Sequence, residues 1–327
     1  MQKLNIAMAS LAFTPLMIAA LSGCETNSAT GRSQFMMLDR AQEVELGLEA
    51  APQMIAEYGG EIASPEVRAY FTEVGNKMAA TTEGDSPSLP WTFTVLNSDV
   101  INAFALPGGK VFVSRGLLQR MTNEAQMAGV VGHEIGHVTA KHVNDRMLQH
   151  SVAGGVTSVL ASVLTEGIGG QIGEVAPNVI KMGGQTVVLR FGREQELEAD
   201  KLGMRYMTNV GYNPRAQRQV MEILGASMGT AAGSEWFSTH PFPQTRIDQI
   251  DALLAGEFSA QANDSSLVFN DLQFQQRCLS KLPPLAGPTD SKGRASLAAA
   301  SRFASQPQLW CSICSTDAGT TAHVLSR

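Results

Sequence analysis

The sequence predicts an α+β fold that is mainly helical and carries a small mixed sheet. Ser64-Pro65 and Asn213-Pro214 mark helix starts, because each pairs a capping side chain with a proline that fits the first helical turn. Strand patterns occur at residues 91–95 and 111–113, on either side of the turn Pro107-Gly108-Gly109. The chain has 327 residues, a net charge of −6 and 17% charged residues, so it lacks the basic footprint of a nucleic-acid-binding protein.

The N-terminus has the pattern of a cleaved export signal. Lys3 supplies a positive charge, an uncharged apolar run extends from Ile6 to Leu21, and Leu21-Ser22-Gly23-Cys24 resembles the bacterial lipobox. About 16 apolar residues is short of the roughly 20 that span a bilayer. We therefore expect residues 1–23 to be a lipoprotein signal peptide, Cys24 to carry the lipid, and residues 24–39 to be a linker. By analogy with lipoprotein sorting, Glu25 after the cysteine favours the outer membrane, facing the periplasm.

The folded domain is expected over residues 40–257, with helices in the order of their periodic segments. Helices are predicted at residues 40–58, 65–80, 214–225 and 244–254, and a further one begins at Asn123 and carries His133 and His137. Residues 151–184 are rich in glycine, alanine and valine, and fit either a mobile hairpin near the site or a loosely packed helical pair. Beyond residue 258 the periodicity fades and we expect a disordered extension that contains Cys278, Cys311 and Cys314. Cys311 and Cys314 are expected to be incidental or to form a labile disulfide, and not to be a redox site.

His133-Glu134-Ile135-Gly136-His137 is the segment that carries chemistry. Residues four apart on an α-helix differ by about 40° around the axis and about 6 Å along it, so both imidazoles can bind one metal ion. Glu134 is placed to accept a proton from a metal-bound water. Gly129, Gly132 and Gly136 are poor helix formers, which indicates that another element, or a substrate, approaches this helix closely.

Further metal ligands are sought in a second helix. The metzincin pattern requires a glycine at position 140 and a histidine at position 143. This chain has Ala140 and Val143 there, so it does not belong to that class. His142 lies about 140° around the helix from His137, so we expect it to point away from the metal, as an exposed or second-layer histidine. Glu196 and Asp200 share one helix face, where one carboxylate can bind the metal and the other can orient a ligand histidine. Glu194 and Glu198 fit a solvated acidic face.

The combination of these motifs resembles the gluzincin metallopeptidases of the HtpX and CAAX-prenyl-protease group, most closely its periplasmic lipoprotein members. Besides the two metal motifs, the resemblance rests on three segments: residues 102–109, which are similar to the family's edge-strand motif, Gly116-Leu117-Leu118, and Ser238-Thr239-His240-Pro241 with Pro243 and Arg246. It covers residues 35–255. A zincin-type domain, with the edge strand beside the active site, is the fold that the resemblance implies.

Position by position, the resemblance implies one Zn²⁺ per chain, held by His133, His137 and Glu196, with Glu134 as general base. Asp200 would orient a ligand, most simply His133. For His240 three roles stay open: a fourth zinc ligand in a resting state, an aid to the transition state, or an ordinary loop histidine. Arg246 would stabilise the oxyanion or form a structural ion pair.

Two functions are compatible with this pattern. The favoured one is a zinc endopeptidase that degrades misfolded or misassembled cell-envelope proteins, whose extended backbone adds as a strand beside Asn102, Ala103, Phe104 and Ala105. The alternative is a non-proteolytic assembly factor that holds outer-membrane protein segments by the same strand. Glu134 favours the enzyme, because a holding protein has no need of a general base beside two metal ligands.

Overall fold

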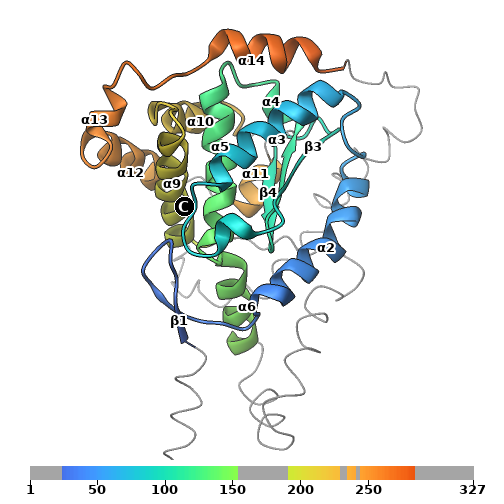
Figure 1. Ribbon diagram of the computed structural model, residues 1–327, viewed down its shortest axis with the longest axis vertical. Helices are drawn as coiled ribbons and strands as arrows, with labels where there is room; N and C mark the ends of the chain where they lie inside the picture. Colours follow the sequence, from blue (N-terminus) through green and yellow to red (C-terminus); the bar gives the residue numbers. More distant parts are fainter. Residues whose placement is uncertain (1–23, 154–190, 229–233, 241–243, 284–327) are drawn as a thin grey trace, which may run out of the picture. The chain divides into compact units, whose positions relative to one another are not determined.

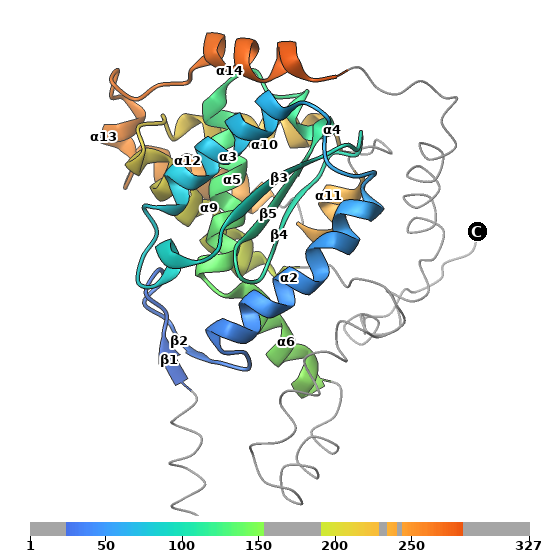
Figure 2. The ribbon, with the colours of Figure 1, turned by 45° about the vertical axis from the view of Figure 1, so that its right-hand side comes forward.

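The computed structural model describes residues 24–153, 191–228, 234–240 and 244–283. These residues belong to one unit that extends to Pro283. The predicted signal peptide, nearly all of the predicted hairpin at 151–184 and the chain beyond Pro283 lie outside the described residues. The fold is α+β, as the sequence predicts, with helices arranged around one small sheet (Figures 1 and 2).

The sheet is mixed and has the strand order β3-β5-β4. β3 (Thr92–Leu96) runs parallel to the central strand β5 (Lys110–Ser114), and β4 (Ala103–Leu106) runs antiparallel to it. Gly108 and Gly109 close the β4–β5 turn at φ values of 71° and 85°, where a side chain would be strained. β4 is therefore an edge strand, and it packs on the helix that carries the two histidines.

Two long helices precede the sheet in the sequence. In α2 (Arg40–Glu57) Asp39 forms a capping box with Gln42, and the helix packs along β4 and β5 (Figure 2). α3 (Pro65–Ala79) is capped by the Ser64 hydroxyl, which accepts from the Val67 amide. α3 buries an apolar face against β3 and α5, formed by Val67, Tyr70, Phe71, Val74 and Met78.

The central helix is α5 (Glu124–Thr139), which is buried along its whole length (Figure 1). α9 (Arg193–Asn209) lies against it so closely that a Cβ on Gly132 would stand 3.0 Å from the Gly203 Cα. The glycines of α5 therefore allow the close approach of another element, which is α9. α10 (Arg215–Ala226) packs on α5, and α12 (Gln244–Ala255) packs on α9. The short helix α4 (Arg115–Leu118) contacts β5, and α11 (Ser234–Thr239) places Trp236 near His133.

The segment expected to be a linker is a packed β-hairpin. β1 (Cys24–Thr26) pairs with β2 (Ser33–Phe35). The Asn27 side chain donates to the Thr139 carbonyl at 2.9 Å, and Gln34 donates to the Ala140 carbonyl at 2.8 Å. These hydrogen bonds attach the hairpin to the end of α5, just before α6 (His142–Ala153).

The C-terminal end also differs from the expectation, because the chain stays folded past residue 257. α13 (Ser259–Ala262) and α14 (Asp271–Arg277) follow, and Phe274 and Cys278 lie in the main apolar core. Buried Glu124, the first residue of α5, accepts from Tyr212 at 2.7 Å and from Asn270 at 2.9 Å. Short polar helices without clear periodicity hide this packing from sequence inspection. Among the described residues, no helix combines the length and apolarity that a membrane span requires.

Candidate metal centre

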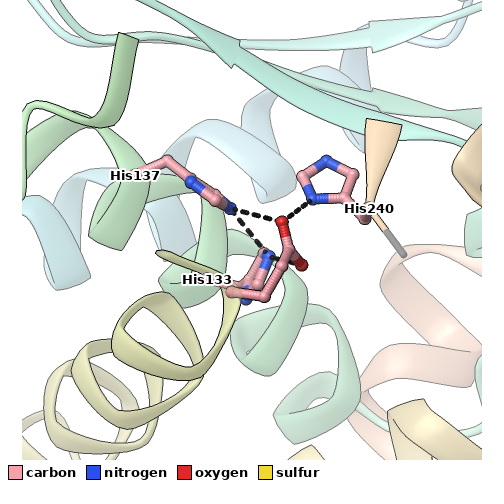
Figure 3. Close-up of side chains that lie close together, drawn as sticks. His133, His137 and His240 are labelled. Atoms are coloured by element: carbon pink, nitrogen blue, oxygen red, sulfur yellow. Dashed lines mark hydrogen bonds and ion pairs between the residues drawn. The ribbon is translucent and has the colours of Figure 1, made fainter. Parts of the chain in front are cut away.

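His133 and His137 lie one helical turn apart on α5 with their rings turned to the same side (Figure 3). Their Nε2 atoms are 3.0 Å apart, and both side chains are buried. The Asn123 side chain accepts from the Gln126 amide and so fixes the start of the helix. The four-residue spacing of His133 and His137 therefore brings the two imidazoles to one point, as the sequence predicts.

Glu196 approaches the same point from α9. Its carboxylate oxygens lie 3.5 Å from His133 Nε2 and 3.6 Å from His137 Nε2. Together with His240, these residues offer four ligand atoms that all lie within 4.8 Å of one another. Among the described residues, these four side chains are the group that could hold a metal ion.

His240 directly follows α11, and its ring lies across the centre from His137 (Figure 3). Its centroid is 5.3 Å from that of His133 and 5.2 Å from that of His137. Its Nδ1 is 3.0 Å from Glu196 Oε1, and its Nε2 is 3.8 Å from Glu134 Oε1. The ring stacks on buried Trp236, with centroids 4.5 Å apart. The structure thus places His240 within the ligand group.

Glu134 lies beside the ligand group and is fully buried. Neither carboxylate oxygen has a hydrogen-bond partner in the part of the chain that the structure describes. Burial raises the pKa of this carboxyl above its usual value, against the opposing effect of His240. An unpaired buried carboxylate is costly, so this group is available for a ligand or a water.

Asp200 and Arg246 support the ligands from behind. Asp200 Oδ1 lies 2.9 Å from His133 Nδ1, and Arg246 donates to both Asp200 oxygens at 2.7 Å. Arg246 also forms a 2.8 Å ion pair with Glu196. Burial alone would raise the pKa of Asp200, but the guanidinium lowers it below its usual value. Of the two roles considered for Arg246, the structure shows the ion pair, because the guanidinium is fully buried and bound to these two carboxylates.

His142 takes the second of the two places expected for it, behind a metal ligand, whereas Glu198 is placed differently from the expectation. His142 does not point into solvent: it is buried, and its Nδ1 lies 2.9 Å from His137 Nδ1. Its Nε2 lies 2.9 Å from Glu198 Oε2, and Arg32 of the hairpin forms an ion pair with the same carboxylate. Glu198 is therefore not a residue of a solvated face. Sequence inspection missed Arg32 and Glu198 because their contact joins segments that lie far apart in the chain.

The predicted substrate strand contains side chains that serve the fold. Asn102 donates to the Tyr58 hydroxyl at 2.9 Å, and Phe104 stacks on Phe112 with centroids 4.8 Å apart. Ala103 is buried, whereas Ala105 is half-buried. A partner strand at this edge would consequently meet backbone more than side chains. Cys24 is exposed at the start of β1.

The four-residue group fits a zinc ion. Zinc sites in proteins use histidine nitrogen and carboxylate oxygen in tetrahedral sets. One of the atoms around the centre, His240 Nε2, is buried without a hydrogen-bond partner among the described residues. Burial alone would lower the pKa of His133, yet Asp200 and Glu196 raise it to about 9, so these carboxylates favour positive charge at this point.

The family model that matches the chain is Peptidase family M48, over residues 65–254. The chain belongs to this family. It is 33% identical to the mitochondrial metalloendopeptidase OMA1 of Arabidopsis thaliana over 189 residues, which are 57% of the chain and 35% of the relative. It is 30% identical to the beta-barrel assembly-enhancing protease of Yersinia pestis over 220 residues, which are 66% of the chain and 45% of the relative. The chain spans less than half the length of these relatives.

Membership of peptidase family M48 confirms the predicted resemblance to a family of metallopeptidases. The matched residues include α5, α9 and the loop with His240, and so contain all four candidate ligands. The hairpin with Cys24 and Arg32 lies outside them.

Proposed function

We propose that this protein is a zinc-dependent endopeptidase that hydrolyses peptide bonds in misfolded or misassembled cell-envelope proteins. The observation that carries the proposal is the unpaired, buried carboxylate of Glu134 beside a group of three histidines and a glutamate. The envelope substrate is supported by the name of a relative, the beta-barrel assembly-enhancing protease. It is also supported by the lipobox-like segment that ends at Cys24.

The residues divide the work between binding and proton transfer. His133, His137 and Glu196 would hold the zinc, which when bound lowers the pKa of a water and polarises a carbonyl. Glu134 accepts the proton of the attacking water and delivers it to the leaving amine. Asp200 keeps His133 in the tautomer that presents Nε2, because its carboxylate accepts the Nδ1 proton.

The substrate is proposed to bind as an added strand at β4, the edge of the sheet that packs on α5. Pairing through backbone groups selects extended segments and depends weakly on side chains. Unfolded and misassembled proteins expose such segments, whereas folded proteins bury them.

Substitution of the base tests the proposal. Cleavage of unfolded casein by the zinc-loaded protein is compared with cleavage by Glu134→Gln, and Glu43→Gln serves as a control at another buried glutamate. We expect Glu134→Gln to bind zinc and to lose about 10²–10⁴-fold in kcat, while the control keeps its activity. Equal cleavage by wild type and Glu134→Gln would refute the assigned base. Absence of cleavage by the zinc-loaded wild type would favour the assembly factor instead.

His240 is proposed as a fourth ligand of the resting enzyme, because it lies within the ligand group and contacts Glu196. Its removal by His240→Ala is expected to weaken zinc binding and to speed the cleavage of casein. Slower cleavage with unchanged zinc affinity would assign it to the transition state.

Lipid attachment at Cys24 is proposed separately. Expression in a Gram-negative host with labelled palmitate should label the wild type and leave Cys24→Ser unlabelled. Incorporation of the label into both proteins would contradict the assignment.

A further inference from the structure

The two histidines on α5 are supported by similar sets of residues on opposite sides of the centre. Behind His133 stands a carboxylate, Asp200, that is held by an arginine, Arg246. Behind His137 stands first His142 and then a carboxylate, Glu198. Glu198 is in turn held by Arg32, whose Nε donates to Oε1 at 3.0 Å and whose Nη2 lies 2.9 Å from Oε2.

The protons of this second set can be placed by elimination. A neutral imidazole that binds a metal through Nε2 carries its proton on Nδ1. The Nδ1 atom of His137 faces the Nδ1 atom of His142 at 2.9 Å, so His137 donates and His142 accepts. His142 then carries its own proton on Nε2 and donates it to Glu198. Each N–H in this set thus has one acceptor, and the Arg32 guanidinium neutralises the carboxylate of Glu198.

Arg32 is held in place by the hairpin. It lies in the turn between β1 and β2, and it also contacts Asp145 of α6 at 3.3 Å. The hydrogen bonds of Asn27 and Gln34 to the Thr139 and Ala140 carbonyls place the hairpin at the end of α5. The hairpin thus ends a chain of hydrogen bonds that begins at a metal ligand.

We propose that His142, Glu198 and Arg32 are positioning residues that fix the tautomer and ring orientation of His137. A segment outside the residues that match the family thereby contributes to metal affinity. This inference rests on the proposed zinc site. Hydrogen-bond partners of metal ligands typically change metal affinity by about 10–100-fold when they are removed.

The test measures the Zn²⁺ dissociation constant of the full chain by competition with a chromophoric chelator, independently of activity. We expect His142→Leu to weaken binding by about 10–100-fold, because the His137 Nδ1 proton loses its acceptor. His142→Asn offers an amide oxygen near the position of Nδ1 and should recover part of the loss. An affinity of His142→Leu within about twofold of wild type would overturn the proposal, given that the usual effect is at least about tenfold.

Arg32 is tested against a matched arginine. Arg32→Gln is expected to weaken Zn²⁺ binding by a few fold, since its ion pairs are partly exposed to solvent. Arg218 also bridges two carboxylates, Glu222 and Asp251, from a half-buried position, and Arg218→Gln should leave zinc affinity unchanged. Equal losses in the two variants would show that Arg32 acts only through general stability.

A double-substitution cycle separates this inference from the proposed function. If Arg32 acts through His142, Arg32→Gln should cost little further affinity in the His142→Leu background. Additive losses would overturn the relay while leaving the zinc site intact. A wild type that binds no zinc would instead overturn the proposed function, and this inference with it. Unfolding of the metal-free variants, followed by circular dichroism, verifies that each of them is folded.

Discussion

Replacement of Arg246 by methionine should strongly destabilise the metal-free protein. The guanidinium is fully buried and contacts three carboxylate oxygens: two of Asp200 at 2.7 Å and one of Glu196 at 2.8 Å. Its removal leaves two buried carboxylates without their cation, and breaking a buried ion pair from one side costs about 3–5 kcal/mol. A domain that is stable by about 5–15 kcal/mol should still fold.

The measurement is the free energy of unfolding in urea, with a chelator present so that zinc cannot take over the charge of Arg246. Arg246→Lys should lose less, about 1.5–3 kcal/mol, because an ammonium restores the charge but not the planar set of donors. Arg218→Met removes a half-exposed guanidinium from two carboxylates and should cost about 1 kcal/mol or less.

A small loss of stability in Arg246→Met would contradict the ion pairs of this residue. A loss below about 1 kcal/mol for Arg246→Met, the range of surface pairs, would show that the two carboxylates are not paired with this residue. If kcat for casein then fell without a change in stability, Arg246 would be the oxyanion donor that the sequence also allowed.

Three further substitutions test the packing and the charges around the centre. In Gly203→Ala the new Cβ would lie 2.8 Å from the His133 backbone nitrogen, so α9 must shift, and urea unfolding should show a loss of about 1–3 kcal/mol. No loss would mean that the helices are not in this contact. Tyr212→Phe removes a 2.7 Å hydrogen bond to buried Glu124 and should cost about 1.5–3 kcal/mol in the same measurement, whereas a neutral effect would contradict that bond. Burial raises the pKa of Glu43 above 4.5, so the native state holds this proton more tightly than the unfolded chain and stability falls as the pH rises through this range. Glu43→Gln should therefore be more stable than the wild type at pH 7, where folding requires this buried carboxyl to be ionised. This gain should vanish near pH 4, and its persistence there would refute the assignment.

Features with a local cause were predictable from the sequence. Ser64 and Asn123 begin their helices because each side chain accepts from an amide three residues later. The two histidines meet because one helical turn separates them. The hairpin at residues 24–35 was not predictable, since its strands have three residues each and are held by carbonyls of α5 more than one hundred residues away.

His142 shows where helical geometry fails. Its expected direction assumed that the helix of His133 and His137 continues to residue 142. In the structure α5 ends at Thr139, and Lys141 adopts a left-handed conformation with φ of 57°. The chain turns there, and His142 begins α6 with its ring against His137. One residue outside the helical region therefore brings His142 against a ligand, and so decides between the exposed and the second-layer position that the sequence left open.

The charges of the centre give a physical reason for its metal. Glu134, Glu196 and Asp200 are buried together, and Arg246 is the buried guanidinium that the described residues place against them. With these three carboxyls ionised and the ligand histidines neutral, as metal binding requires, two negative charges remain, and an unbalanced buried carboxylate is strongly unfavourable. A divalent cation at the point where the four ligand atoms converge neutralises both charges. The excess of carboxylates at this point thus contributes to the binding of zinc, and Asp200, itself held by Arg246, orients His133 toward the ion.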